Sequence, residues 1–249
     1  SEVLTGIRER GVRDREAEAQ LARYRLGLGE VEAALALLPE AAARWDQDAE
    51  LRYLWGRALE MQDDIAGARR RLVEAVERAP SMPVYRIGLL RTLVLHHRAD
   101  LGAEQPDREQ ATLQDLARDH VQKAAVTVHQ QDADGHMIIA YTYRALGDLE
   151  RACRHFQMAS EVQDNRLGAL LELAFCQQEA GQMSEARKTL TNLRHEYPDD
   201  PEVANSYGYF LAEVGEDLKL AERLVKQALA AEPDNGAYLD SLGWVYFQQ

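Results

Sequence analysis

A pattern of small and apolar residues returns along the chain at intervals of 34 residues. Each copy contains a small residue flanked by apolar ones, then a turn, and then the motif Ala-x3-apolar-x2-Ala or a close variant of it. In one copy the small residue is Gly56 and the motif is Ala68, Leu72 and Ala75. A unit of this length cannot bury its apolar face alone, so repeated units stack on one another. The period therefore predicts an array of similar units rather than a fold built around one central core.

The residue types within each copy favour helices. Hydrophobic residues make up 46% of the chain and charged residues 29%, which is ordinary for a folded protein. The strong helix formers Ala, Leu, Glu, Arg and Gln dominate, and the Val-Ile-Thr alternation typical of strands is missing. A small residue at each crossing lets two antiparallel helices approach closely. We therefore expect an all-α chain of antiparallel helix pairs.

Six complete copies and one half copy can be placed in phase. They cover residues 15–48, 49–82, 83–132, 133–166, 167–200, 201–235 and 236–249, the last being the half copy. In the half copy we expect Leu239, Leu242, Gly243 and Tyr246 to occupy the core positions of a first helix whose second helix is absent. Residues 1–14 are interpreted as the end of a preceding second helix. Both ends thus indicate a piece of a longer array.

The third copy is longer than the others by 15 residues, and the extra stretch is polar. Pro106-Asp107 is a plausible helix start, so we expect a loop over residues 99–106 and a lengthened second helix from about residue 107. The insertion at 99–116 is interpreted as a tolerated addition at the surface, with a docking element as the alternative.

Two single residues also disturb the pattern. Leu90 holds the small-residue position of the third copy, and Gly88 two residues earlier leaves the register of this copy open. Pro39 falls inside the second helix of the first copy, where it predicts a kink or an early stop.

These residues and spacings resemble the tetratricopeptide repeat family, and the resemblance covers nearly the whole chain. It implies a right-handed superhelical solenoid of antiparallel helix pairs, in which the first helices line a concave groove that binds peptide segments or partner helices. It also implies a non-catalytic scaffold or adaptor whose partner is a protein or a peptide. The segment "VANSYGYFLAEVGEDLKLAERLVKQALAAEPDNGAYLDSLGWVYF" is similar to arrays of bacterial envelope proteins, which favours the periplasm or cell envelope, with the cytoplasm as the alternative.

In this family the residue directly after the small one commonly faces the groove. The resemblance therefore implies a row of groove residues, with two more residues one turn further along the same face. The row is Arg23, Arg57, Arg91, Tyr141, Phe175, Tyr209 and Trp244, and the two further residues are Arg144 and Phe247. We expect the arginines to pair with carboxylates and the aromatic residues to hold apolar side chains or proline. The alternative is that the arginines are solvated and the aromatic rings pack on the neighbouring first helix.

The charge distribution limits the class of partner. Residues 1–99 hold 16 basic and 16 acidic side chains, whereas residues 100–249 hold 13 basic and 26 acidic ones and carry the whole net charge of −13. Binding a nucleic acid needs a positive surface, so we expect no nucleic-acid partner. The sequence has no apolar run long enough to cross a membrane, so we expect no direct membrane insertion in this segment. Self-association through the C-terminal helix is a further possibility for this chain.

The sequence contains no catalytic constellation. The Gly-x-Gly at 27–29 lies between two expected helices rather than after a strand, and the histidines are scattered. We therefore expect no enzymatic activity, no cofactor and no metal site. Cys153 and Cys176 are interpreted as small buried apolar residues, and a single disulfide remains the alternative. The alternative function is that the array is a module of a larger enzyme or of an outer-membrane polysaccharide-export protein, whose activity lies outside this segment.

Overall fold

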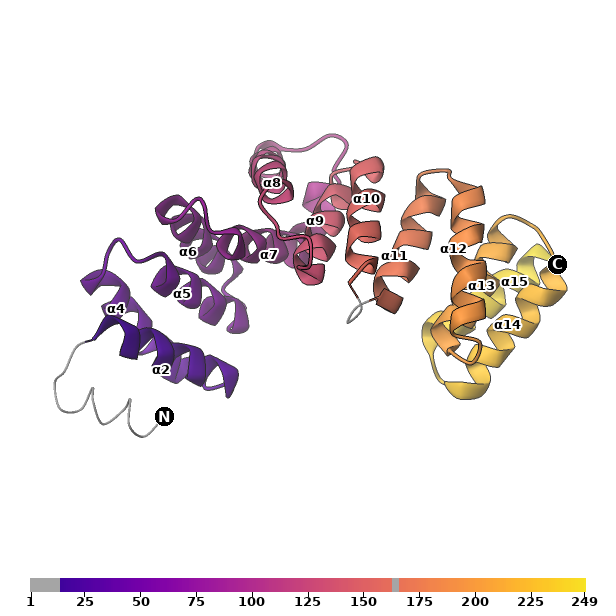
Figure 1. Cartoon of the computed structure of the whole chain (residues 1–249), viewed down its shortest axis with the longest axis horizontal. Helices are drawn as coiled ribbons and strands as arrows, with labels where there is room; N and C mark the ends of the chain where they lie inside the picture. Colours follow the sequence, from indigo (N-terminus) through magenta and orange to yellow (C-terminus); the bar gives the residue numbers. More distant parts are fainter. Residues whose placement is uncertain (1–13, 163–165) are drawn as a thin grey trace. The chain divides into compact units, whose positions relative to one another are not determined.

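The computed structural model describes residues 14–162 and 166–249, and within them the regular secondary structure is entirely α-helical (Figure 1). The predicted all-α class of antiparallel helix pairs is confirmed. The interpretation of residues 1–14 as the end of a preceding helix falls, apart from Asp14, outside the described residues. The chain forms two compact units, which are described separately below: Ser1–His129 with Tyr141–Gly147, and Gln130–Ala140 with Asp148–Gln249.

The helices of the first unit alternate between first and second members of a pair. They are α2 (Arg15–Gly27), α3 (Val31–Leu35), α4 (Leu38–Arg44), α5 (Ala49–Met61), α6 (Ile65–Arg78), α7 (Pro83–Leu101), α8 (Arg108–Ala125) and the C-terminal part of α9 (Ala133–Ala145). We call α2, α5, α7 and α9 first helices, and α3 with α4, α6 and α8 second helices. The turn between the two helices of a pair is short in most of these pairs, as between α5 and α6, which pack against each other.

The second unit continues the alternation. It contains the N-terminal part of α9 and then α10 (Leu149–Ser160), α11 (Arg166–Glu179), α12 (Met183–Glu196), α13 (Pro201–Glu213), α14 (Leu218–Ala231) and α15 (Gly236–Gln248). Here α11, α13 and α15 are first helices, and α10, α12 and α14 are second helices. We propose that each first helix and the second helix that follows it form one repeat.

The small residues lie where the two helices of a pair cross. A Cβ atom added to Gly56 in α5 would lie 2.8 Å from Cγ of Leu72 in α6. A Cβ added to Gly208 in α13 would lie 2.7 Å from Cγ2 of Val225 and 3.0 Å from the carbonyl oxygen of Ala221 in α14. The repeated apolar residues of the second helices are buried beneath these crossings, including Ala68, Leu72, Ala75, Ala152, Phe156, Ala159, Ala186, Leu190, Leu193, Ala221, Val225 and Ala228.

The same substitution is expected to have opposite effects at two of these glycines. In Gly208→Ala the new methyl group meets a stiff Val225 side chain and backbone, so we expect a loss of about 1–2 kcal/mol in the free energy of unfolding. In Gly243→Ala nothing lies within 4 Å of the new atom, and the better helix propensity of Ala is expected to add up to about 1 kcal/mol. Urea denaturation of the two variants measures both values. Equal effects of the two substitutions would contradict the close crossing at Gly208.

Pro39 interrupts the second helix of the first pair, as predicted. The helix is divided into α3 and α4, and Pro39 lies in the first turn of α4. A proline there has no N–H to donate to the preceding turn, and its ring clashes with the carbonyl four residues earlier. The two short helices still bury Ala34, Leu38 and Ala41, which form the Ala-x3-apolar-x2-Ala motif of this copy.

In the lengthened third pair, the predicted start of the second helix is confirmed and the predicted start of the loop is wrong. Helix α8 begins directly after Asp107, whose side chain accepts hydrogen bonds from the N–H groups of Glu109 and Gln110. The expected loop over 99–106 is wrong at its start, because α7 continues through a kink at His97 to the buried Leu101.

The register of α7 follows Leu90 rather than Gly88. Leu90 is fully buried at the position that other copies give to a small residue. Gly88 serves a different contact, since a Cβ added there would lie 2.5 Å from Cε2 of Tyr53 in the neighbouring first helix. The two residues therefore make close contacts on two different faces of α7.

The expected core positions of α15 need correction. Leu239 and Tyr246 are 50% and 48% exposed, and Gly243 is exposed as well, whereas Tyr238, Ser241 and Val245 are buried. Leu242 is partly buried against the core of the second unit. The physical reason is that the face of Gly243 corresponds to the face of Gly208 that α14 covers, and no described helix lies over it.

Two features are absent from the residues that the structure describes. None of their helices combines the length and the apolar character that crossing a membrane requires. No three of their His, Cys, Asp or Glu side chains are grouped so that they could hold a metal ion.

Candidate peptide-binding site

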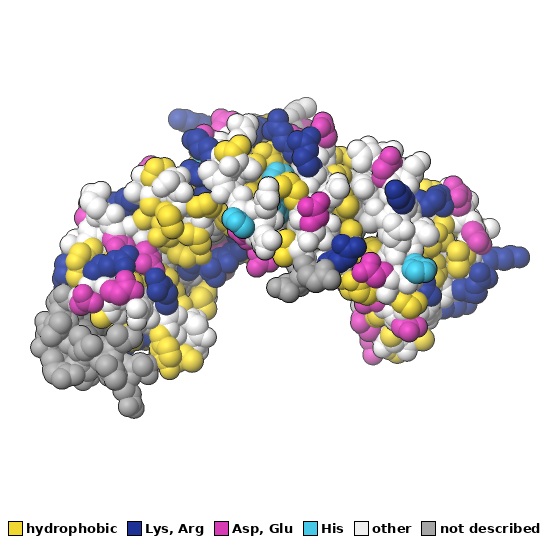
Figure 2. All heavy atoms as spheres, viewed as in Figure 1, with side chains coloured by type: hydrophobic (Ala, Val, Ile, Leu, Met, Phe, Trp, Pro, Cys, Tyr) yellow, Lys and Arg dark blue, Asp and Glu magenta, His cyan; other side chains and the backbone are white. Residues whose placement is uncertain are grey.

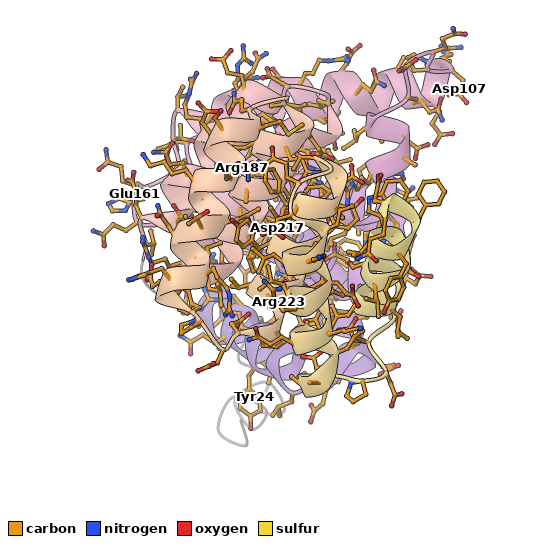
Figure 3. All side chains as sticks on the ribbon, turned by 90° about the vertical axis from the view of Figure 1, so that its right-hand side faces the viewer. Tyr24, Asp107, Glu161, Arg187, Asp217 and Arg223 are labelled. Atoms are coloured by element: carbon orange, nitrogen blue, oxygen red, sulfur yellow. A yellow bond between two sulfur atoms is a disulfide. The ribbon has the colours of Figure 1, made fainter. Side chains whose placement is uncertain are left out.

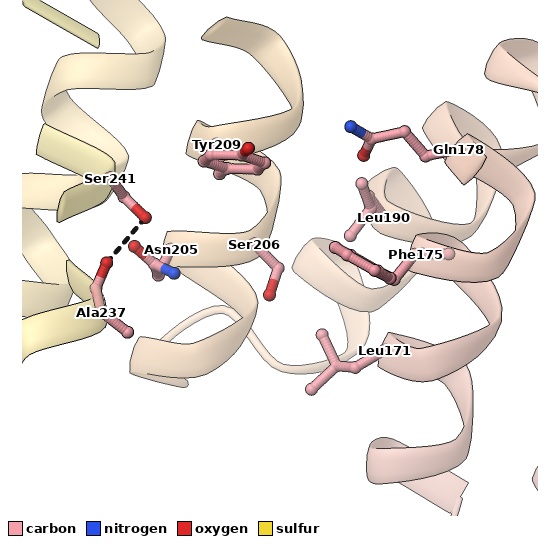
Figure 4. Close-up of a pocket in the computed structure, with 10 residues that line it drawn as sticks. Leu171, Phe175, Gln178, Leu190, Asn205, Ser206, Tyr209, Ala237 and Ser241 are labelled. Carbon is pink, nitrogen blue, oxygen red and sulfur yellow. Dashed lines mark hydrogen bonds between the residues drawn. The ribbon is translucent and has the colours of Figure 1, made fainter. Parts of the chain in front are cut away.

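A pocket of about 250 Å³ opens between the first helices α11, α13 and α15 of the second unit (Figure 4). We call it the aromatic pocket, because Phe175 from α11 and Tyr209 from α13 stand on either side of it. The other lining residues are Leu171, Ala174, Gln178, Leu190, Asn205, Ser206, Ala237 and Ser241. The pocket is thus lined by apolar and neutral polar groups, with no charged side chain among them.

The repeat pattern explains why the two rings reach this pocket. Phe175 and Tyr209 directly follow Ala174 and Gly208, the small residues of their copies. Successive residues of a helix differ by about 100°, so a residue next to the crossing turns away from the second helix. Phe175 is 43% exposed. Partial burial raises the pKa of the Tyr209 phenol, and the neighbouring carboxylate of Glu213 raises it further.

The polar groups of the pocket offer hydrogen bonds. Ser241 Oγ donates to the carbonyl oxygen of Ala237 at 2.9 Å, so this hydroxyl retains lone pairs that can accept. Oδ1 of Asn205 is buried and has no hydrogen-bond partner among the described residues. A buried acceptor without a donor costs about 1–3 kcal/mol. The pocket can therefore hold an apolar side chain between the rings while Asn205 accepts a hydrogen bond from a nearby N–H group.

Trp244 and Phe247 form a separate pair on α15. Their rings stack with centroids 5.2 Å apart and planes 18° apart. Trp244 is partly buried against the core of the second unit, and Phe247 is 77% exposed. Neither residue lines the aromatic pocket. The structure therefore brings Phe175 together with Tyr209, and Trp244 together with Phe247.

Two of the arginines line a second pocket, in the first unit. This pocket has a volume of about 320 Å³ and lies between α2 and α5. Its lining residues are Arg23, Leu26, Gly27, Tyr53, Leu54, Arg57 and Met61. We call it the arginine pocket.

The three arginines of the predicted row are paired with carboxylates of their own chain. Arg23 donates to Glu50, which also accepts from Arg15 at 2.8 Å. Arg91 donates to Glu60 at 2.7 Å, and Arg57 Nε lies 3.3 Å from the same carboxylate. Figure 2 shows basic and acidic side chains next to one another over the helices near the N-terminal end of the described chain. These internal partners differ from both expectations, which were solvated arginines or arginines paired with carboxylates of a ligand.

Tyr141 and Arg144 occupy the part of α9 that belongs to the first unit. Both side chains are half-buried, and neither lines the aromatic or the arginine pocket. The structure does not bring them into either of these sites.

The structure also shows a disulfide between Cys153 and Cys176, with Cα atoms 5.5 Å apart. It joins α10 to α11 and corrects the interpretation of the two cysteines as unpaired apolar residues. The repeat pattern contained a signal for it, since Cys153 lies on the second helix of one copy and Cys176 on the first helix of the next. These are the surfaces that meet when copies stack.

A buried histidine pair is a second feature that the sequence analysis missed. Nδ1 of His136 in α9 and Nδ1 of His155 in α10 are 3.1 Å apart, and the side chains are 0% and 7% exposed. Burial lowers the pKa of His155 to about 4 and also lowers that of His136. One ring must therefore donate a hydrogen bond to the other while both are neutral.

Two family models, both described as tetratricopeptide repeat, match residues 19–83 and 143–207, which together are just over half of the chain. The chain is a tetratricopeptide repeat (TPR) protein. The two matches include Arg23 and Arg57 in the first segment and Phe175 in the second.

Solved structures show the same fold. PilW, a type IV pilus biogenesis factor, aligns with a TM-score of 0.67 at 14% identity over 92% of this chain and 98% of its own. PilF of Pseudomonas aeruginosa aligns with a TM-score of 0.64 at 16% identity over 91% and 95%. YrrB, described as a TPR protein with an unusual peptide-binding site, gives 0.60 at 17% identity over 82% and 96%. No curated protein sequence matches the chain.

The TPR fold is that of a protein-interaction scaffold, and TPR proteins are in general non-catalytic. Because the sequence identities to the solved structures are low, the likeness to them concerns the fold alone. The class of ligand must therefore be inferred from the residues that line the pockets of this chain.

Proposed function

We propose that this TPR protein is a non-catalytic scaffold or adaptor that binds a protein or peptide segment along its first helices, with the aromatic pocket as the main contact. The observation that carries the proposal is the pocket between Phe175 and Tyr209, which has the unpaired Oδ1 of Asn205 beside it. Aromatic side chains around a partly desolvated pocket are typical of binding hot spots. The peptide-binding site described for YrrB, which has the same fold, supports the proposal.

A peptide fits this pocket because it supplies both groups that the pocket lacks. An apolar side chain placed between the two rings buries apolar area of both, at about 25 cal/mol for each Å² removed from water. A backbone N–H of the same peptide satisfies Asn205, which removes the cost of its unpaired acceptor. Small apolar molecules would satisfy only the first of these needs.

The arginine part of the row has a smaller role in this proposal. A ligand carboxylate would compete with Glu50 for Arg23 and with Glu60 for Arg57 and Arg91. We propose that these pairs mainly hold α2, α5 and α7 together. The arginine pocket is then a secondary contact along the bound segment.

Changing one ring of the aromatic pocket tests the proposal. Random linear peptides displayed on phage are selected on the chain, and the affinities of the enriched peptides are measured by titration calorimetry. Phe175→Ala or Tyr209→Ala is expected to weaken binding by about thirtyfold, because truncating a hot-spot aromatic costs about 2 kcal/mol.

The matched control for Phe175 is Met183→Ala. Met183 begins the second helix α12 and is 42% exposed, almost the same as Phe175, but it does not line the pocket. This control is expected to bind as the unchanged chain does, and circular dichroism reports whether each variant is folded. Full affinity in folded Phe175→Ala and Tyr209→Ala variants would exclude the aromatic pocket as the binding site.

We also propose that the chain works in an oxidising compartment, in bacterial envelope assembly or export. The disulfide between Cys153 and Cys176 supports this setting, because disulfides persist in the periplasm and outside the cell and are rare in the cytosol. Thiol labelling of the denatured chain taken directly from its host, without reductant, tests the setting. Labelling of both cysteines would place the chain in a reducing compartment.

A further inference from the structure

Charged residues are divided between the first and second helices at the C-terminal end of the second unit. The first helices α11, α13 and α15 carry five acidic residues and one basic residue. The second helices α12 and α14 carry six Lys and Arg residues and three acidic ones. Arg187 on α12 and Arg223 on α14, both labelled in Figure 3, belong to this basic set. The first helices, which also form the aromatic pocket, are therefore net acidic and the second helices net basic, and the turns between these helices carry six further acidic residues.

The single basic residue of these first helices is already engaged. Arg166 lies at the start of α11, where its Nε is 3.4 Å from Glu196 of α12 and its Nη1 donates to the carbonyl oxygen of Ser160 at 3.2 Å. The residues that line the aromatic pocket include no Lys or Arg. A positive charge at this site must therefore come from the ligand.

Acidic residues lie next to the pocket on α13 and α15. On α13, Glu202 precedes Asn205 and Ser206 by about one turn, and Glu213 follows Tyr209 by about one turn. Residues three or four apart share a face of a helix, so both carboxylates lie on the pocket side of α13. On α15, Asp240 directly precedes Ser241, which lines the pocket.

The carboxylates near Glu202 repel one another. Burial and the charges of Asp200, Glu172 and Glu232 raise the pKa of Glu202 above its ordinary value. Asp200 is held in place as the cap of α13, where it accepts a hydrogen bond from the N–H of Val203. A cation bound beside Glu202 would relieve this repulsion.

We propose that the segment bound in the aromatic pocket carries Lys or Arg next to its apolar side chain. This inference rests on the proposed function and names the class of partner: a basic, partly apolar protein segment. An acidic surface that served only solubility would not require the first helices to be net acidic while the second helices beside them are net basic. The apolar hollow and the amide acceptor of Asn205 require a peptide rather than a simple polyamine.

The test uses three fluorescein-labelled peptides with the same Leu-Trp-Leu core, flanked by lysines, serines or glutamates. Their affinities are measured by fluorescence anisotropy at low and high salt. The lysine peptide is expected to bind about fivefold more tightly than the serine peptide and the glutamate peptide more weakly than either, and high salt is expected to reduce these differences.

Neutral variants locate the effect. Glu202→Gln combined with Asp240→Asn is expected to remove most of the preference for lysine while the serine peptide binds as before. The matched control is Glu150→Gln combined with Glu185→Gln, which removes two exposed carboxylates from the second helices α10 and α12 and is expected to keep the preference.

The outcomes separate this inference from the proposed function. Equal affinities for the lysine and serine peptides, both lost in Phe175→Ala, would overturn the basic preference and leave the proposed function standing. A preference for lysine that persists in the Glu202 and Asp240 double variant would also overturn it. Absence of binding by all three peptides, or binding that Phe175→Ala does not change, would overturn the proposed function and this inference with it.

Discussion

Replacing Cys153 and Cys176 together by alanine is expected to lower the free energy of unfolding of the second unit by about 3 kcal/mol. The disulfide joins residues 23 apart in the sequence, and closing a loop of that length restricts the unfolded chain by about this amount. Both sulfur atoms lie in buried side chains, so the double variant also leaves small cavities. Urea denaturation, followed by circular dichroism, measures the change.

The reductant dithiothreitol separates the loss of the cross-link from the loss of side-chain volume. The unchanged chain is expected to lose most of the 3 kcal/mol when it is reduced, whereas the double variant should not respond to dithiothreitol. Identical unfolding curves for the oxidised and reduced forms of the unchanged chain would refute a stabilising cross-link between α10 and α11.

The second large effect is expected from pH. The pKa of His155 in the folded chain is about 4, below the ordinary value of 6.5, and that of His136 is also lowered. The folded state therefore favours the neutral rings, and stability is fully present above pH 6.5. As the pH falls from 6.5 towards 4, the unfolded chain takes up the proton first, and we expect a loss of about 3 kcal/mol in the second unit.

Other charges near the pair modify this value without reversing it. Asp132 and Glu161 favour the charged form of His136, and Arg154 disfavours that of His155. Replacing both His136 and His155 by leucine is expected to flatten the pH dependence of the urea midpoint over this range.

His195→Gln provides the matched control, because His195 is exposed near the end of α12. It should leave the profile unchanged. A double leucine variant that kept the full acid sensitivity would assign that sensitivity to carboxylates rather than to the histidines.

The positions of the helices could be predicted because they depend on spacing alone. A small residue at each crossing and an Ala-rich motif one helix later determine which faces meet, as at Gly208 and Ala221. Asp107 gave a correct start for α8 because its side chain caps the helix locally. The end of α7 could not be predicted in this way, since Leu101 extends the helix by packing into the core.

The candidate site was predictable in part for the same reason. Phe175 and Tyr209 are placed by their sequence position next to a crossing, and the structure brings them into one pocket. The partners of the arginines could not be predicted, because they depend on which carboxylates lie on the neighbouring helices. Arg91, for example, donates to Glu60, which is 31 residues away in the sequence. Which face of α15 is exposed likewise depends on the neighbouring helices, and the residues of α15 do not specify these neighbours.

The carboxylate of Glu60 couples the effects of mutations at several neighbouring positions. It receives hydrogen bonds from Arg91 at 2.7 Å and from the hydroxyl of Thr92 at 2.6 Å, and it also lies beside Arg57. Loss of Glu60 alone would leave two partly buried guanidinium groups without their anion, so the effects of changes at these positions are not additive. During evolution, Glu60 and the residues that contact it on α5 and α7 should therefore be replaced together rather than one at a time.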